Sequence, residues 1–151
     1  MISYNSENTK IPNIPRRKVS AWIRDIAAQN GKRTGEIAYI FCSDERILEI
    51  NNQYLNHDYY TDIITFDYSE NKTISGDIFI SLETVVSNAE KFNTTSENEL
   101  YRIIIHGILH LCGFKDKSAL DEKIMREKEN EALQMFEAMN SSTNHSLNKF
   151  K

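Results

Sequence analysis

The apolar stretch at residues 100–111 constrains the fold more than any other part of the chain. Its apolar residues recur at the three- and four-residue spacing of a helix and occupy almost every side of it: Leu100, Ile103, Ile104, Gly107, Ile108 and Leu111. A helix that is apolar all round must be covered by other elements, so we expect it at the centre of the core. Residues 96–99, Ser-Glu-Asn-Glu, have the order of a capping box and predict a helix start at about Glu97.

Two histidines interrupt this apolar helix. His106 and His110 are four residues apart, which places them on one helix face about 5.4 Å apart along the axis, so both imidazoles can reach one ion. Gly113 follows the last periodic residue, where a left-handed turn reverses the chain and makes Asp116 the nearest third ligand. Three protein ligands with a fourth position for water form a catalytic zinc site. The alternative is that both histidines are hydrogen-bonded core residues, the more common role of a single histidine on an apolar helix.

The rest of the chain alternates predicted helices and strands. Helices are expected from about Pro15 to Asn30, from Ser43 or Asp44 to about residue 50, from 82 to about 92, and from 119 to about 139. Strands are expected at residues 36–42, 63–66 and 74–81. Residues 1–13 are interpreted as a loosely held arm, and residues 51–60 as a polar loop that carries aromatic side chains.

These elements predict an α+β fold with a single domain over residues 1–140. We expect a small mixed β-sheet packed with helices, and the metal site at the end of the central helix. Asp62 and Asp77 are interpreted as structural carboxylates at strand ends, and the Glu and Lys residues of the last helix as a solvated face. Residues 141–151 are rich in Ser and Asn and lack apolar periodicity, which predicts a disordered tail.

Composition limits the compartment and the partners. No apolar run approaches the roughly 20 residues of a membrane span, and the N-terminus has no apolar signal core, so we expect a cytoplasmic protein without a membrane partner. Cys42 and Cys112 form no disulfide framework, which fits a reducing compartment. The net charge of −4 argues mildly against a nucleic-acid partner, although basic residues cluster at 16–18, at 32–33 and at Lys115 with Lys117.

Residues 106–116 resemble the signature of the YbeY endoribonucleases, also called rRNA maturation factors. The family pattern is His-Gly-x-Leu-His-Leu-x-Gly-x-x-His. Every fixed position but the last is met, by His106, Gly107, Leu109, His110, Leu111 and Gly113. The third zinc-binding histidine of the family falls on Asp116. This departure leaves the third ligand open, although a carboxylate can fill the role.

A second region carries the same resemblance. Thr61, Asp62 and Phe66 match the family's Thr-Asp-Val-Leu-Ser-Phe strand, and the Gly-Asp-Ile at residues 76–78 matches the start of its next strand. The loop arginine that the family uses for activity falls on Leu55. Because a leucine offers neither charge nor a guanidinium fork, RNA binding in this chain must use other groups.

The resemblance covers about residues 36–130 and implies a function. It implies a single-strand-specific, zinc-dependent endoribonuclease that acts in late 16S ribosomal RNA maturation and in ribosome quality control. One Zn²⁺ per chain would be held by His106, His110 and Asp116, and the partners would be ribosomal RNA and the small ribosomal subunit. Bases could stack on Tyr54, Tyr59 and Tyr60, and phosphates could contact Lys115 and Lys117. No catalytic residue is assigned from the sequence.

Other readings of the same residues stay open. A non-catalytic, ribosome-associated RNA-binding module with a structural metal is favoured by Leu55 and by the negative net charge. An interaction protein with core histidines is the third reading. Two histidines and a carboxylate also form the ligand set of non-haem iron oxygenases, but the resemblance favours zinc. A metalloprotease is disfavoured, because Gly107 occupies the position of the general base in His-Glu-x-x-His.

Overall fold

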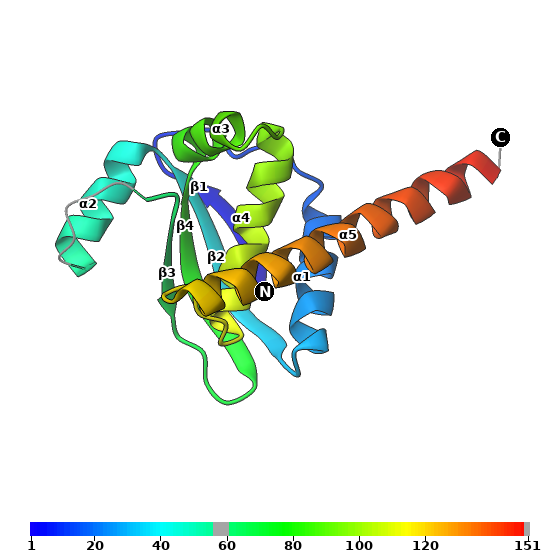
Figure 1. The fold of residues 1–151 in the computed structure, drawn as a ribbon, viewed down its shortest axis with the longest axis horizontal. Helices are drawn as coiled ribbons and strands as arrows, with labels where there is room; N and C mark the ends of the chain where they lie inside the picture. Colours follow the sequence, from blue (N-terminus) through cyan, green and yellow to red (C-terminus); the bar gives the residue numbers. More distant parts are fainter. Residues whose placement is uncertain (56–60, 150–151) are drawn as a thin grey trace.

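A four-stranded mixed sheet forms the centre of an α+β domain with five helices among the described residues (Figure 1). The computed structural model describes the backbone of residues 1–55 and 61–149 and the side chains of residues 1–54 and 61–140. The strands lie in the spatial order β1 (Ile2–Ser6), β2 (Arg33–Cys42), β4 (Thr73–Ser81) and β3 (Ile63–Asp67). β1 and β4 run parallel to β2, whereas β3 is antiparallel to β4. The predicted mixed sheet is therefore confirmed.

The strand β1 corrects the prediction of a loose arm at residues 1–13. Ile2–Ser6 pairs in parallel with residues 37–41 of β2. The ring of Tyr4 stacks on that of Tyr39 at a centroid distance of 5.6 Å, and its hydroxyl lies 2.9 Å from the Ser20 hydroxyl. Five residues with mixed polarity show no clear alternation, so the long-range pairing defines this strand rather than its own pattern.

The helices cover the two faces of the sheet unequally. α1 (Arg16–Gln29), α4 (Ser96–Leu111) and α5 (Ala119–Lys149) lie on one face, α2 (Asp44–Leu55) covers part of the other, and α3 (Leu82–Lys91) packs against α4 (Figure 1). Alternation along β4 explains the division, because Ile78 and Ile80 join the larger apolar cluster while Phe79 packs against the smaller cluster under α2.

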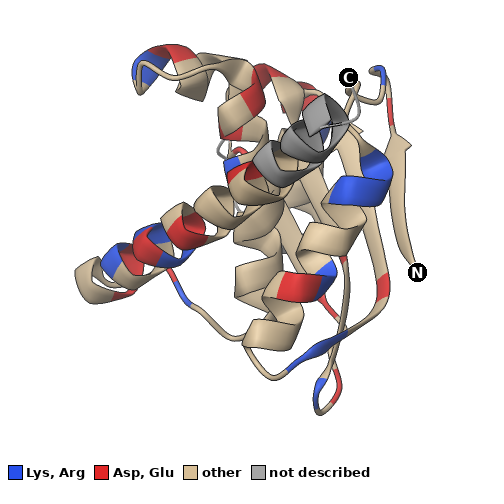
Figure 2. Cartoon of the chain, turned by 90° about the vertical axis from the view of Figure 1, so that its right-hand side faces the viewer, with Lys and Arg blue, Asp and Glu red and all other residues tan. Residues whose placement is uncertain are grey.

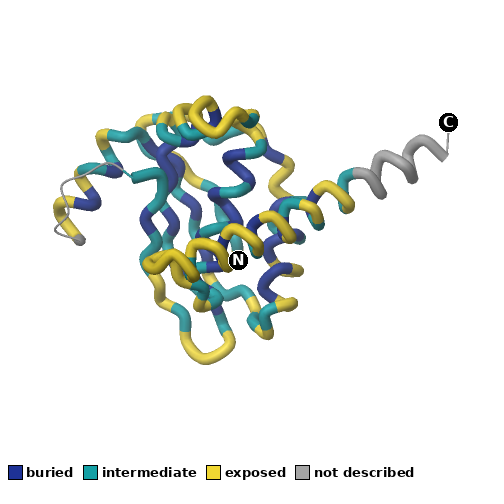
Figure 3. Tube along the Cα trace, in the orientation of Figure 1, coloured by how far each residue is buried: buried dark blue, intermediate teal, exposed yellow. Residues whose placement is uncertain are grey.

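The helix α4 is central, as its apolar pattern predicts (Figure 3). The hydroxyl of buried Tyr39 donates to the Ile104 carbonyl at 2.8 Å and links α4 to β2. Gly107 brings the helix close to β4, since a Cβ there would lie 3.0 Å from the Ile78 side chain. The N-cap is Thr95, whose hydroxyl accepts from the Asn98 amide at 3.0 Å, so the helix begins one residue before the predicted start.

Two helices are longer than predicted. α2 continues to Leu55, so the first part of the predicted polar loop is helical, and residues 56–60 lie outside the described residues. α5 continues to Lys149, past the predicted end near Met139 and through most of the segment predicted to be a disordered tail. Extending an existing helix adds a hydrogen bond per residue without a new nucleus, so a helix can outlast its apolar pattern. The domain boundary at residue 140 stays a prediction.

The predicted cap of α3 and the predicted end of α1 are confirmed. Ser81 caps α3 by accepting from the Thr84 amide at 3.3 Å, and Gly31 ends α1 with a φ of 72°.

No helix in the described part of the chain is long and apolar enough to cross a membrane.

Candidate active site

His106 lies at the centre of the candidate site, held between two carboxylates. Its Nδ1 is 2.7 Å from Oε2 of Glu129 on α5, and its Nε2 is 3.3 Å from Oδ2 of Asp116 in the loop between α4 and α5. An ionised carboxylate only accepts hydrogen bonds, so Nδ1–H donates to Glu129 and Nε2 is left to face Asp116. Metal-ligating histidines are oriented by a carboxylate in this way.

Glu129 is almost fully buried, and three cationic or polar groups compensate its charge. Its Oε1 accepts from Nη1 of Arg102 at 3.0 Å, and Nη1 of Arg126 lies 3.8 Å away. Burial by itself raises the pKa of the Glu129 carboxyl, but the hydrogen bond and charge of His106, the hydrogen bond from Arg102 and the charge of Arg126 outweigh it and lower the pKa. The carboxylate is therefore ionised at neutral pH and can orient the imidazole.

The same environment acts on His106. Burial lowers the pKa of the imidazole, but the hydrogen bond and charge of Glu129, followed by the charges of Asp116 and Asp62, raise it above its usual value. The same carboxylates around the His106 ring, those of Glu129, Asp116 and Asp62, would also attract a cation to this position.

Two adjoining cavities meet at this histidine. One has a volume of about 370 Å³ and is bordered by the start of β3, by α3, by α4 and by α5. The other, about 580 Å³, follows the first turns of α5. Both are lined by His106, Asp116, Arg126 and Glu129. The candidate site is thus open to a molecule that extends in two directions.

The turn after α4 places Asp116 as the sequence predicts. Gly113 has a φ of 108°, a left-handed conformation that favours glycine. Its amide donates to the His110 carbonyl at 3.0 Å, and the Phe114 amide donates to the Leu109 carbonyl at 3.1 Å. These bonds end the helix and direct the chain back, so that Asp116 meets the ring of His106.

The comparison with known proteins decides the family. The family described as Endoribonuclease YbeY matches residues 2–137 of this chain. The chain belongs to the YbeY family. The Endoribonuclease YbeY of Bacteroides thetaiotaomicron is 58% identical over 134 residues, covering 89% of this chain and 98% of the relative. That of Phocaeicola vulgatus is 61% identical over 133 residues, covering 88% and 96%.

A solved structure shares the fold of this chain. The solution structure of TM1509 from Thermotoga maritima aligns with a TM-score of 0.65 and 27% identity, covering 95% of this chain and 93% of the other. The YbeY relatives are named endoribonucleases, which are hydrolases of phosphodiester bonds. The family resemblance drawn from residues 106–116 is therefore confirmed.

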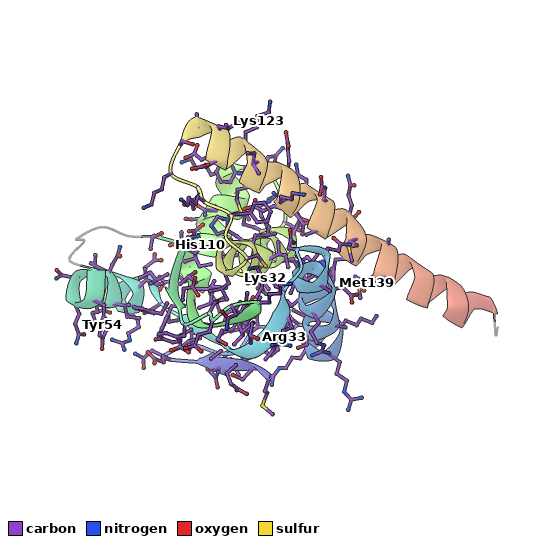
Figure 4. All side chains as sticks on the ribbon, turned by 90° about the horizontal axis from the view of Figure 1, so that it is seen from below. Lys32, Arg33, Tyr54, His110, Lys123 and Met139 are labelled. Carbon is purple, nitrogen blue, oxygen red and sulfur yellow. The ribbon has the colours of Figure 1, made fainter. Side chains whose placement is uncertain are left out.

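The structure assembles part of the predicted YbeY metal site. His106 and Asp116 meet, whereas His110 lies on the last turn of α4 beside the loop that leads to α5 (Figure 4). Among the described residues, no group of three or more His, Cys, Asp or Glu side chains is arranged to hold a metal ion. The Nε2 of His106 and the carboxylate of Asp116 suit zinc as donors. The three-ligand site stays a prediction.

Three residues of this candidate site were missed from the sequence. Glu129 was placed on a solvated face, and Arg102 and Arg126 were not singled out. The spacing of charges along α5 does not show which turn crosses α4, and acidic and basic residues alternate along its first half (Figure 2). One signal was present: Arg102 precedes His106 by four residues, on the same face of an otherwise apolar helix.

The tyrosines predicted to stack on RNA bases either lie apart from the two cavities or fall outside the described residues. Tyr54 is 61% exposed and packs edge-on against Phe66 under α2, on the other face of the sheet. Tyr59 and Tyr60, and the side chain of Leu55, lie outside the described residues.

The two aspartates interpreted as structural differ in position. Asp62 lines the first cavity and accepts from Nδ2 of Asn88 at 3.2 Å, and burial raises the pKa of its carboxyl. Asp77 instead accepts from the Tyr68 hydroxyl at 3.3 Å, on the face that α2 covers. A structural role for both stays a prediction.

Proposed function

We propose that this chain is a metal-dependent, single-strand-specific endoribonuclease of ribosomal RNA maturation. The observation that supports it most is the placement of His106, whose Nδ1 is held by Glu129 while Nε2 faces Asp116 where two cavities meet. The names of its YbeY relatives support the same reaction. The proposal includes a cytoplasmic location, one Zn²⁺ per chain, and ribosomal RNA with the small ribosomal subunit as partners in late 16S processing and ribosome quality control.

The metal proposal rests on the chemistry of the donors. His106 supplies an imidazole nitrogen, Asp116 a carboxylate, and His110 would complete the set from one turn along the same helix face. Held by these residues, a zinc ion would supply Lewis-acid chemistry, namely a water of lowered pKa and a polarised phosphoryl oxygen.

The chain's own groups prepare this site. Glu129 keeps the proton on Nδ1 of His106, so Nε2 is the ring nitrogen that a cation would bind, in place of the proton that Nε2 can share with Asp116. Arg102 holds the other carboxylate oxygen at 3.0 Å, so the Glu129 side chain cannot rotate without losing a charged hydrogen bond. The imidazole is thereby oriented before any substrate arrives.

Cleavage of single-stranded RNA tests the proposal. Purified protein should cut single-stranded regions of ribosomal RNA, and a chelator or His106→Ala should stop the cutting. Readdition of zinc should restore it in the wild type alone. Cleavage that survives both His106→Ala and His110→Ala would come from a contaminating nuclease. A pure wild type that shows no metal-dependent cleavage would contradict the proposal.

A second function is a ribosome-associated RNA-binding module whose metal serves folding. Leu55, which stands where the family has its loop arginine, and the net charge of −4 favour it. Metal-independent RNA binding without cleavage, even with ribosomal subunits supplied, would select this module over the enzyme.

A further inference from the structure

The two arginines that face Glu129 differ in how much of each side chain reaches solvent. Arg102 is 17% exposed, with Nη1 3.0 Å from Glu129 and Nε 4.0 Å from Glu99. Arg126 is 55% exposed, and its Nη1 lies 3.8 Å from the same Glu129 oxygen. The guanidinium of Arg102 is therefore bound to carboxylates. Arg126, with its five donors, is more than half exposed and lies beyond hydrogen-bond distance of Glu129.

The position of Arg126 places those donors at the candidate site. It precedes Glu129 by three residues, on the same face of α5. It lines both cavities together with His106 and Asp116. A molecule that passes from one cavity to the other beside His106 must also pass Arg126.

The carboxyl groups on the wall of the first cavity make a cationic contact necessary for an RNA substrate. Four carboxyl groups and two guanidinium groups line the first cavity. An RNA backbone carries one negative charge per phosphate, so it needs cationic contacts to enter such a site. Arg102 is already paired with two carboxylates, which leaves Arg126 as the more exposed guanidinium of the two.

We propose that Arg126 binds a phosphate of the RNA substrate beside His106, through two parallel hydrogen bonds to non-bridging oxygens. This inference rests on the proposed endoribonuclease function. A guanidinium matches a phosphate in such a fork, and the contact is about twice as strong as one between neutral groups. Glu129 keeps Arg126 near the site at 3.8 Å without a close hydrogen bond that would occupy its donors. Arg126 is thus a substrate-binding residue supplied by α5.

The test compares three variants of the zinc-loaded protein: Arg126→Ala, Arg126→Lys and Lys128→Ala. Lys128→Ala is the matched control, since it removes one positive charge from the same helix, where Lys128 pairs with Glu131. Single-turnover cleavage of single-stranded RNA gives the half-saturating concentration and the maximal rate. Equilibrium binding to single-stranded DNA of the same sequence, measured over a range of salt concentrations, reports phosphate contacts without cleavage.

The expected result separates Arg126 from its control. Arg126→Ala should raise the half-saturating concentration about 10-fold or more, as the loss of a charged hydrogen bond requires. The slope of log affinity against log salt should become shallower by about 0.7. Arg126→Lys should keep the slope and recover part of the affinity, because it keeps the charge without the fork. Lys128→Ala should keep its affinity within about twofold of wild type, because an exposed charge pair such as Lys128 with Glu131 contributes little.

Two outcomes would overturn the inference. If Arg126→Ala and Lys128→Ala bind with equal affinity and equal salt slope, Arg126 contacts no phosphate. If Arg126→Ala loses zinc or melts several degrees lower and Arg126→Lys does the same, Arg126 serves only to hold Glu129. A wild type that never cleaves RNA would end the proposed function instead, and the ratio of DNA affinities between the variants would still decide the role of Arg126.

Discussion

The two faces of the sheet bury different chemistry. Between α4 and α5, an ionic network lies against the larger apolar cluster: Glu99, Arg102, His106 and Glu129. On the face that α2 covers, the smaller cluster holds Cys42, Ile47, Ile50 and Ile64, and aromatic rings line a hollow of about 290 Å³. Tyr54 and Tyr68 there remain 61% and 58% exposed.

The difference shows what a buried charge requires. Burying a carboxylate is costly unless charged hydrogen bonds replace its water, and two packed helices supply those partners on the first face. Every buried side-chain nitrogen or oxygen atom of the described residues has a hydrogen-bond partner. Among the described residues, α2 is the one helix that covers this face, and its aromatic side chains stay partly in water. The site therefore formed where two helices cross.

Removing Glu129 should give the largest loss of stability, because the buried ionic network that distinguishes the α4 and α5 face from the α2 face depends on it. Glu129→Ala leaves Arg102 and His106 without their buried partner, and we expect a loss of about 3 to 5 kcal/mol in unfolding free energy. Urea unfolding measures it. Glu129→Gln, which keeps the shape, is the control and should lose less. Equal stability of Glu129→Ala and wild type would show that the buried network does not support the fold.

The histidine pair should decide metal content. Protein purified without chelator should contain close to one zinc per chain by elemental analysis, and His106→Ala or His110→Ala should lose it. A folded, active wild type without metal would refute the zinc proposal. Loss of zinc in only one of the two variants would exclude the other histidine from the ligand set.

Asp116 should have a graded effect on the same site. Asp116→Ala should weaken zinc binding by at least about 10-fold to 100-fold, the cost of even an outer group around a metal. Asp116→His should keep the metal, because imidazole is also a zinc ligand. Competition with a chromogenic chelator measures the affinity. If Asp116→Ala binds zinc as tightly as wild type, a different residue or water takes the third position.

A substitution on the α2 face should lower stability only slightly and should not change the zinc content. Tyr54→Ala removes an exposed ring that packs edge-on against Phe66 at 5.8 Å, and we expect a loss of about 1 kcal/mol. Zinc content should stay at the wild-type level, because the sheet separates Tyr54 from His106. A variant that loses zinc would show that the two faces are coupled.

Neither face should depend on the end of the chain. The family match ends at residue 137, and residues 142–151 carry no assigned ligand. Deleting residues 142–151 should leave the melting temperature and the zinc content unchanged. A drop of several degrees in the thermal scan would mean that this segment packs against the domain.

Sequence by itself determined the features that depend on neighbours within a turn or a strand. The buried helix α4, the pairing of His106 with His110 on one face, and the Gly113 turn that returns Asp116 all follow from spacings of a few residues. The β-branched and aromatic alternation predicted β2 and β4, and the family signature at residues 106–116 predicted the family itself.

Tertiary structure alone decided which distant residues meet. β1 exists because it pairs with β2, more than thirty residues along the chain, and its own five residues carry no decisive pattern. Glu129 reaches His106 across 23 residues, yet its charged neighbours on α5 have the same spacing as a solvated face. Local periodicity records only which side chains share a face. The crossing of α4 and α5, set by packing of the whole core, determines which face is buried and which charges orient the site.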